Sequence, residues 1–312
     1  MRVKYFKSTL LSTAMFFSGI SVAKDEPKVS FKSTEVGDGI YMLAGEGGFT
    51  GGNLGLLVGD DGVVLIDDSM PPFLDIMNEA IASITDQPID FLINTHVHGD
   101  HIGNNATLGE GGTHIVAHDN LRKHLVTKGV QGEDGMVPAP KAALPVLTFS
   151  EEMSFHFNGQ PAKAIHVPKA HTDGDAVIHF TAANVIHAGD TFFNGLFPYI
   201  DLDSGGSVDG YINAQMTMIS MSNDETTIIP GHGPLSNKKE LQSAVDMLID
   251  AKAIIAKHVK DGKSLEEVVA ANPLEKYHEG WNWGFITTER MTTQLYNDAV
   301  KGHSHGGHDH SH

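Results

Sequence analysis

The residues with the clearest chemical potential lie in one short segment, residues 95–101, which reads Thr-His-Val-His-Gly-Asp-His. Three imidazoles and one carboxylate fall within six residues of this sequence. These groups are well matched to zinc, and polar groups clustered in a protein interior need either pairing or a metal. The segment therefore predicts a metal site, and a polar loop with chance histidines is the weaker explanation.

The stretch before this segment explains how it is positioned. Residues 89–94 are largely apolar, and we expect them to form a buried strand. A turn from strand to loop would place His96 and His98 side by side and bring Asp100 and His101 to a neighbouring position. The four candidate ligands are therefore expected at the end of a strand.

The same segment resembles the His-x-His-x-Asp-His signature of the metallo-β-lactamase superfamily. Three further parts of that family's pattern follow in order, and they contain His171 (His-Thr-Asp-Gly-Asp), Asp190 (Ala-Gly-Asp) and His232 (Pro-Gly-His-Gly). The resemblance covers roughly residues 35–240, and four ordered motifs are more specific than any one of them.

The resemblance implies a centre of two zinc ions, although iron or manganese in one position stays open. The first ion would be held by His96, His98 and His171. The second would be held by Asp100, His101 and His232, and Asp190 would bridge the two. The implied fold is of the α/β class: an αββα sandwich in which two mixed β-sheets, flanked by helices, hold the metals at one edge.

The resemblance also implies an enzyme, a metal-dependent hydrolase. It would cleave an ester, thioester, lactone or lactam carbonyl by attack of a metal-bridging hydroxide, because water held between two cations loses its proton near neutral pH. Asp100 and Asp190 would be the catalytic carboxylates. No thiol nucleophile or thiolate ligand is available, since the chain contains no cysteine.

Asp190 also bears on the substrate. A carboxylate stands where the family's cysteine-ligand β-lactamases carry a thiolate, and a bridging Asp resembles the thioesterase, lactonase and phosphodiesterase branches. No Lys or Arg lies within twenty residues after Asp190. An uncharged or weakly anionic small-molecule substrate is therefore expected. The residues expected to line its pocket are Phe49, Phe192, Phe193, Phe197, Trp281 and Trp283.

Three of these pocket residues have a second interpretation. Phe49 lies in a glycine-rich segment between two expected strands, where relatives carry a mobile loop, and it could equally well pack in the core. Trp281 and Trp283 lie beside an expected helix, and packing is the favoured interpretation for both.

The chain divides into four expected parts. Residues 1–23 are typical of a signal peptide, because Arg2, Lys4 and Lys7 precede an apolar run that ends in small residues. Residues 24–245 would form the catalytic domain, with strands at 39–43, 53–58 and 63–66, a hairpin turn at 59–62, an irregular region at 127–145, and hairpin-like strands at 146–149 and 153–157. Residues 246–300 would form a helical extension, and residues 301–312 a flexible tail.

Composition narrows the expected compartment and partners. The signal peptide predicts export, to the periplasm, and no later segment is long and apolar enough to span a membrane. The net charge of −18 disfavours nucleic acids and anionic membranes as partners. The sequence leaves the oligomeric state open.

Two alternative functions remain. One is a genuine periplasmic β-lactamase, and the other is a periplasmic zinc-binding or zinc-delivery protein. The second is favoured only by the Gly- and Ser-rich tail, which would bind metal weakly through five histidines: His303, His305, His308, His310 and His312. A complete set of seven ligands with a bridging aspartate favours catalysis.

Overall fold

The computed structural model of the protein describes residues 28–132 and 134–305, without the side chains of residues 302–305. The expected signal peptide lies outside the described residues, as do all the tail histidines except His303 and His305, which end helix α9. In the part of the chain that is described, no helix is long and apolar enough to cross a membrane.

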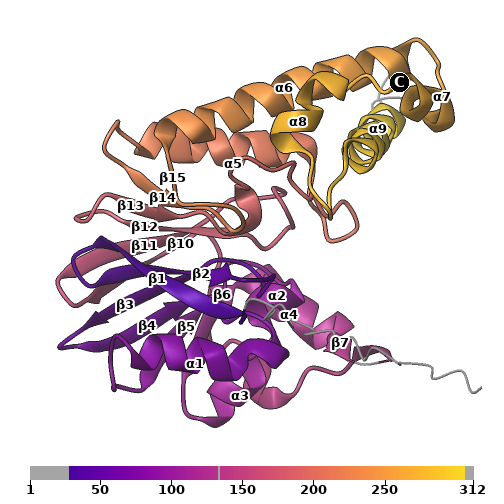
Figure 1. Ribbon diagram of the computed structural model, residues 1–312. Helices are drawn as coiled ribbons and strands as arrows, with labels where there is room; N and C mark the ends of the chain where they lie inside the picture. The colour runs from indigo at the N-terminus through magenta and orange to yellow at the C-terminus, as the bar shows by residue number, and fades with distance from the viewer. Residues whose placement is uncertain (1–27, 133, 306–312) are drawn as a thin grey trace, which may run out of the picture.

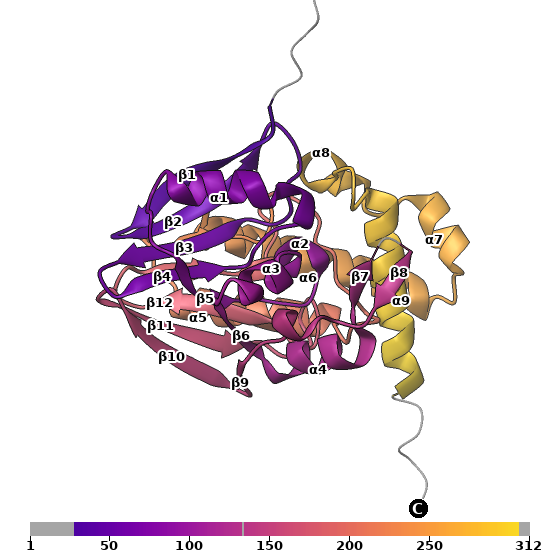
Figure 2. The ribbon, with the colours of Figure 1, turned by 90° about the horizontal axis from the view of Figure 1, so that it is seen from below.

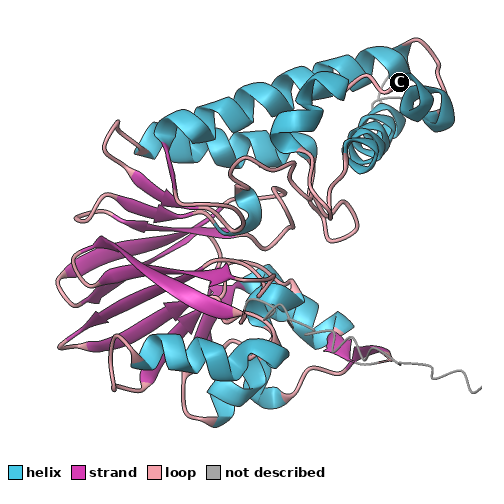
Figure 3. Cartoon of the chain, viewed as in Figure 1, coloured by secondary structure: helices cyan, strands magenta, loops and turns pink. Residues whose placement is uncertain are grey.

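Two β-sheets form the centre of the molecule (Figures 1 and 3). The first has the order β1-β2-β3-β4-β5-β6-β9, with the strands β1 (Ser30–Gly37), β2 (Ile40–Glu46), β3 (Leu54–Gly59), β4 (Gly62–Ile66), β5 (Ile89–Ile93), β6 (His114–His118) and β9 (Leu147–Phe149). The second has the order β10-β11-β12-β13-β14-β15, with β10 (Glu152–Phe157), β11 (Gln160–His166), β12 (Ala176–Phe180), β13 (Val185–His187), β14 (Thr227–Ile229) and β15 (Ser236–Asn237). Both sheets contain parallel and antiparallel pairs, so both are mixed.

Helices cover the outer face of each sheet, which gives four layers (Figure 3). Below the first sheet lie α1 (Leu74–Ala82) and α3 (Asn105–Glu110), and above the second lie α5 (Val208–Met221) and α6 (Lys238–Lys260). The main core lies between the sheets, where Ile66 and Val116 of one pack with Ile178 and Phe180 of the other. Burial of apolar side chains on both faces of each sheet is what holds the sandwich together. The expected αββα fold is confirmed.

The C-terminal helices pack at one end of the sandwich (Figure 2). They are α7 (Leu265–Ala271), α8 (His278–Trp281) and α9 (Thr288–His305). Their core is shared with earlier residues, because Phe193 and Tyr211 belong to the same buried cluster as Leu248 and Leu295. The boundary expected after residue 245 falls inside α6, so the structure shows no break there.

Several local predictions can be compared with the structure. The hairpin turn at residues 59–62 is present, with Gly59 paired to Gly62. The hairpin expected from residues 146–149 and 153–157 is wrong, because β9 pairs with β6 in the first sheet and β10 with β11 in the second. This connection is instead the crossing point between the sheets.

The remaining elements are short. They are α2 (Gly99–Ile102), α4 (Asp119–Lys128), β7 (Val130–Gly132), β8 (Gly135–Val137), and the 3-10 turns Pro71–Phe73, Lys141–Ala143, Gly189–Thr191 and Glu275–Tyr277. The expected irregular region at 127–145 thus contains a small hairpin, in which Val130 pairs with Val137.

Candidate metal centre

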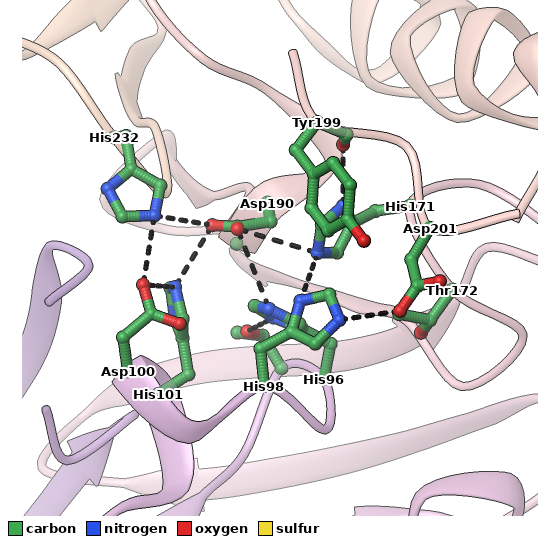
Figure 4. Close-up of polar contacts among 12 residues, drawn as sticks. His96, His98, Asp100, His101, His171, Thr172, Asp190, Tyr199, Asp201 and His232 are labelled. Atoms are coloured by element: carbon green, nitrogen blue, oxygen red, sulfur yellow. Dashed lines mark hydrogen bonds and ion pairs between the residues drawn. The ribbon is translucent and has the colours of Figure 1, made fainter. Parts of the chain in front are cut away.

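The seven residues singled out by their motifs come together at one edge of the sandwich (Figure 4). His96, His98, His171 and Asp190 form one group and Asp100, His101 and His232 another, and within each group the candidate ligand atoms lie within 4.8 Å of one another. Asp190 faces both groups. Its Oδ2 lies 3.6 Å from His96 Nε2 and 3.5 Å from His171 Nε2, whereas its Oδ1 lies 3.1 Å from His101 Nε2 and 3.5 Å from His232 Nε2.

Strand ends explain this convergence. The segment with the first four ligands follows β5, and His98 is the residue before α2, whose first turn carries Asp100 and His101. Asp190 follows β13, and His232 follows β14, which is the parallel neighbour of β13. Because neighbouring parallel strands end at the same edge of a sheet, Asp190 and His232 are delivered to one place.

Two glycines allow the ligand loops to approach each other. A Cβ added to Gly231 would lie 2.1 Å from Asp190 Oδ1, and a Cβ added to Gly52 would lie 2.1 Å from the His101 ring. Asn53 then ties these loops together, because its side chain donates to the carbonyls of Pro230 and Gly233 at 2.9 Å each. Glycine is required at positions 231 and 52 by this close contact.

Four of the imidazoles make an outward hydrogen bond that fixes the ring. His96 Nδ1 donates to Thr95 Oγ1 at 3.0 Å, and Thr95 Oγ1 in turn donates to Asp67. His171 Nδ1 donates to the carbonyl of Tyr199 at 2.7 Å. In the neutral ring, an outward proton leaves a lone pair on the inward nitrogen, which is the form that binds metals.

The other two outward bonds end on carboxylates. His98 Nε2 donates to Asp201 at 2.9 Å, and His101 Nδ1 donates to Asp67 at 2.7 Å. The inward atoms His98 Nδ1 and His171 Nε2 are then only 2.7 Å apart. Two lone pairs at this distance repel each other unless a cation lies between or beside them.

The buried polar atoms provide an independent test of whether metals fit. His96 Nε2, His101 Nε2 and Asp190 Oδ1 are buried, and none of them makes a hydrogen bond of normal geometry within the described chain, although His101 Nε2 lies 3.1 Å from Asp190 Oδ1. Buried polar atoms without partners are rare and require an explanation. Because all three are good zinc ligands and all three face the same space, the residues present fit a metal centre.

The electrostatics at the two ends of the site differ. Burial lowers the pKa of His96 well below its usual value, and burial with the nearby His98 lowers the pKa of His171 to about 4, so both rings are neutral. Burial also acts to lower the pKa of His232, but Asp190 and Asp100 outweigh it and raise the pKa to about 9. The carboxylates at this end therefore attract positive charge, which metal cations would supply in place of protons.

Sequence reasoning missed several residues that support the ligands. Tyr199 and Asp201 follow His171 by about thirty positions, and no motif marks them. Asp67 is not among these missed residues. It directly follows the strand expected at residues 63–66, a place from which a carboxylate can support metal-bound histidines, and its carboxylate lies against His101 and Thr95. Its φ of 59° lies in the left-handed region, which Asp tolerates better than most residues.

The expected aromatic pocket residues lie in two different environments. Phe192 and Phe197 are completely buried in hydrophobic clusters, so their side chains pack in the core and do not line a pocket. Phe193 is also buried, but its ring lies 4.9 Å from the His232 ring. Phe49 is 58 % exposed and stacks on His232 at 5.9 Å. Phe49 is thus not packed in the core, and its ring lies beside a candidate ligand.

The two tryptophans also differ. Trp281 packs against the core clusters of the C-terminal helices and α5, as the packing interpretation expects. Trp283 also packs against the core cluster of the C-terminal helices, and in addition its ring lies 6.2 Å from the His232 ring and 6.1 Å from the Phe193 ring. It is therefore at the site, together with Phe285 and Tyr199, whose rings are 5.6 Å apart.

Comparison with known proteins agrees with this geometry. The family model described as the metallo-beta-lactamase superfamily matches residues 47–232. No curated protein matches the sequence.

Among solved structures, the metallo-beta-lactamase from Pontibacter korlensis is 16% identical with a TM-score of 0.56, and the match covers 70% of this chain and 99% of that one. The metallo-beta-lactamase FIM-1 from Pseudomonas aeruginosa, in its mono-zinc form, is 18% identical with a TM-score of 0.57, covering 72% and 97%. The DIM-1 metallo-beta-lactamase is 15% identical, also with a TM-score of 0.57, covering 72% and 100%.

At these identities the solved structures show a shared fold, and the family model covers the span that holds all seven clustered residues. The chain belongs to the metallo-beta-lactamase superfamily.

Proposed function

We propose that this protein is an exported hydrolase with two zinc ions, which cleaves an ester, thioester, lactone or lactam. The observation that carries the proposal is the position of Asp190, whose two oxygens face two separate groups of histidines. A single ion held by one of these groups would leave the other group of histidines without a metal. A carboxylate whose two oxygens each lie beside a different group of histidines supports a pair of metals bridged by that carboxylate.

The side chains divide between the two ions as the motifs imply. His96, His98 and His171 would hold one ion, Asp100, His101 and His232 the other, and Asp190 both. When bound, the ions would lower the pKa of water to near neutrality and polarise the carbonyl of the substrate.

The protein's own part in the reaction centres on Asp100. Burial acts to raise the pKa of Asp100, but His101 and His232 outweigh it and lower the pKa, so the carboxylate is ionised. Its side chain is 23% exposed, compared with 5% for Asp190. Asp100 is therefore the carboxylate that can accept a hydrogen bond from incoming water and orient it toward the substrate.

The surroundings of the centre support an apolar carbonyl compound as the substrate. Phe49 and Trp283 lie on the His232 side, and Tyr199 lies 5.7 Å from the His98 ring. Aromatic side chains exclude water and favour an apolar acyl or aryl group. β-Lactam hydrolysis stays a second candidate, because solved structures of similar fold carry that name.

Export is proposed from the sequence of residues 1–23 alone. Removal of this segment would give a mature chain that begins near Lys24. Intact-mass measurement of the natively expressed protein tests it directly. A chain that retains Met1 would contradict export by this route.

The activity is tested with zinc-loaded protein of measured metal content and a panel of neutral 4-nitrophenyl esters, thioesters, lactones and a cephalosporin. We expect hydrolysis of at least one ester, thioester or lactone that is lost on chelation and restored by zinc. Asp190→Ala should abolish it, and Asp246→Ala, at an exposed residue of α6, should not. Activity that survives chelation would contradict the proposal. A cephalosporin turned over much faster than every other substrate would instead favour the second candidate, a β-lactamase.

A further inference from the structure

The C-terminal extension contributes directly to the mouth of the metal centre. The segment from α8 to α9 is fastened to the loop after Asp190 by two bonds: Trp283 Nε1 donates to the carbonyl of Phe197 at 2.9 Å, and Phe197 N donates to the carbonyl of Trp281 at 2.8 Å. These bonds hold the Trp283 ring beside His232. The wall of the site is therefore built in part by residues outside the span of the family model, which ends at residue 232.

This segment also brings a cation to the site. Arg290, in the first turn of α9, places its guanidinium 4.2 Å from the centre of the Phe285 ring and 5.4 Å from that of Tyr199. Tyr199 in turn lies 5.7 Å from the His98 ring and 5.8 Å from the His171 ring. The guanidinium is thus separated from the candidate ligands by no more than one aromatic ring.

Most N–H donors of Arg290 make no hydrogen bond within the described chain. A guanidinium has five N–H donors, and the bond from Nη1 to the carbonyl of Phe285 at 3.0 Å uses one of them. No carboxylate of the described chain forms an ion pair with Arg290. A planar guanidinium that lies over aromatic rings is well suited to bind a carboxylate through two parallel hydrogen bonds.

We propose that Arg290 binds an anionic group on the substrate, at a distance from the carbonyl that reacts. This inference rests on the proposed function and specifies its substrate class: an ester or thioester whose acyl chain is apolar in the middle and ends in a carboxylate. The carbonyl lies at the metal centre, the apolar part lies along Tyr199, Phe285 and Trp283, and the terminal carboxylate reaches Arg290.

The separation distinguishes this class from β-lactams. In a penicillin or cephalosporin the carboxylate is attached to the carbon next to the lactam nitrogen, so it lies close to the bond that is cleaved. The Tyr199 ring lies 5.7 Å from the His98 ring and 5.4 Å from the Arg290 guanidinium, so the guanidinium neighbours this ring and does not contact His98 itself. A carboxylate at the far end of a flexible acyl chain fits this position better.

The inference also refines the expectation of an uncharged or weakly anionic substrate. That expectation depended on the absence of Lys and Arg from the twenty residues after Asp190, which is correct along the sequence. Folding nevertheless brings Arg290 to the site from about a hundred residues away. The sequence that follows Asp190 therefore contains no nearby cation, although the folded protein places Arg290 next to Tyr199.

The test compares two esters with the same leaving group, mono-4-nitrophenyl adipate and 4-nitrophenyl hexanoate. The measured quantity is the ratio of their kcat/KM values with the zinc-loaded, full-length protein. We expect a ratio well above one, which falls about fivefold to tenfold in Arg290→Met, as loss of a partly exposed charge-assisted bond would cause. The preference should also weaken at high salt.

A matched control is Arg122→Met. Arg122 also donates to a backbone carbonyl, that of Pro145, but on α4 and away from the metal centre. Its variant should keep the wild-type ratio. A ratio that is the same in wild type and Arg290→Met, or that falls equally in Arg122→Met, would overturn the proposal.

A binding measurement keeps the inference testable apart from catalysis. Calorimetry with the zinc-loaded protein would compare hexanohydroxamic acid with its analogue bearing a terminal carboxylate, since both can bind metal through the hydroxamate. We expect the carboxylate to improve affinity in wild type and not in Arg290→Met. If no ester is hydrolysed but this difference in affinity is found, the proposed reaction is wrong and the Arg290 site is supported. If the terminal carboxylate changes the affinity equally in wild type and in Arg290→Met, the Arg290 site is wrong.

Discussion

His101 Nδ1 donates a 2.7 Å hydrogen bond to Oδ2 of Asp67. The same carboxylate oxygen accepts from Thr95 Oγ1 at 2.7 Å, and Thr95 Oγ1 accepts from His96 Nδ1. His96 and His101 belong to different groups of ligands. One buried carboxylate therefore orients a ligand in each half of the centre.

The first prediction follows from this connection. Asp67→Asn replaces an acceptor with an amide that cannot accept all of these bonds, so both halves should weaken together, with zinc affinity falling about tenfold to hundredfold. Competition with a fluorescent chelator measures both binding steps. The matched control is Asp68→Asn: burial raises the pKa of Asp68 well above its usual value, and its carboxyl accepts from Asn104 N rather than from a histidine. Weakening of only one step would contradict the shared role of Asp67.

The second prediction concerns the space beside Asp190. A methyl group at position 231 would lie 2.1 Å from Asp190 Oδ1, with backbone atoms of Gly189 at 2.7 Å. Gly231→Ala should therefore displace the carboxylate and cost the protein at least part of its bound zinc, as measured by metal analysis after gel filtration. Gly280→Ala is the control, because a methyl group there meets nothing within 4 Å. Full metal content in Gly231→Ala would show that the loop can move without effect.

The third prediction concerns the dependence of stability on pH. The His118 ring stacks on His166 with centroids 3.6 Å apart, its Nδ1 accepts from Asn120 N at the start of α4, and its Nε2 donates to the carbonyl of Ser150. Burial and His166 lower the pKa of His118. The unfolded chain therefore binds the proton more readily, so stability from this group is full above pH about 6.5 and is lost as the pH falls toward the lowered pKa.

His118→Asn should flatten this part of the pH profile, because Asn can cap α4 but does not titrate. The measurement is the difference in urea midpoint between variant and wild type at pH 7.5 and pH 5.5, which cancels the contribution of the other histidines. His156→Asn, at an exposed position in β10, is the control. If the loss of stability on acidification is as steep in His118→Asn as in wild type, the stacked pair is not its source.

The fourth prediction concerns the histidine tail. A chain that ends at Lys301 keeps all seven clustered residues and should still bind about two zinc ions. Asp190→Ala should reduce turnover by orders of magnitude, whereas His303→Ala combined with His305→Ala should not. Equal effects of the two changes would instead favour a role for the tail in supplying the site.

The sequence was sufficient for the parts of the fold and site that depend on local pattern. The segment around His96 and the Gly59–Gly62 turn are each specified by adjacent residues, so they could be read along the chain. The pairing of β9 and β10 could not, because two short strands separated by a turn also fit a hairpin, and only packing between the sheets decides between them.

The site residues that were missed come from distant segments. Asp201 and Arg290 reach the centre only because α5, α6 and α9 pack on the second sheet and on each other. Phe192 and Phe197 follow Asp190 directly and were expected in the pocket, but the chain after Asp190 turns into the core. The motifs along the sequence predicted which seven residues cluster at the candidate metal centre. The aromatic and cationic residues around that centre could not be predicted in this way, because they depend on tertiary packing.

The most direct test of the dinuclear centre is anomalous diffraction at the zinc edge from crystals of the full-length protein grown with zinc. The account predicts two peaks, one on the Oδ2 side of Asp190 near His96 and His171, and one on the Oδ1 side near His101 and His232. A single peak, or two peaks of which neither contacts Asp190, would contradict it.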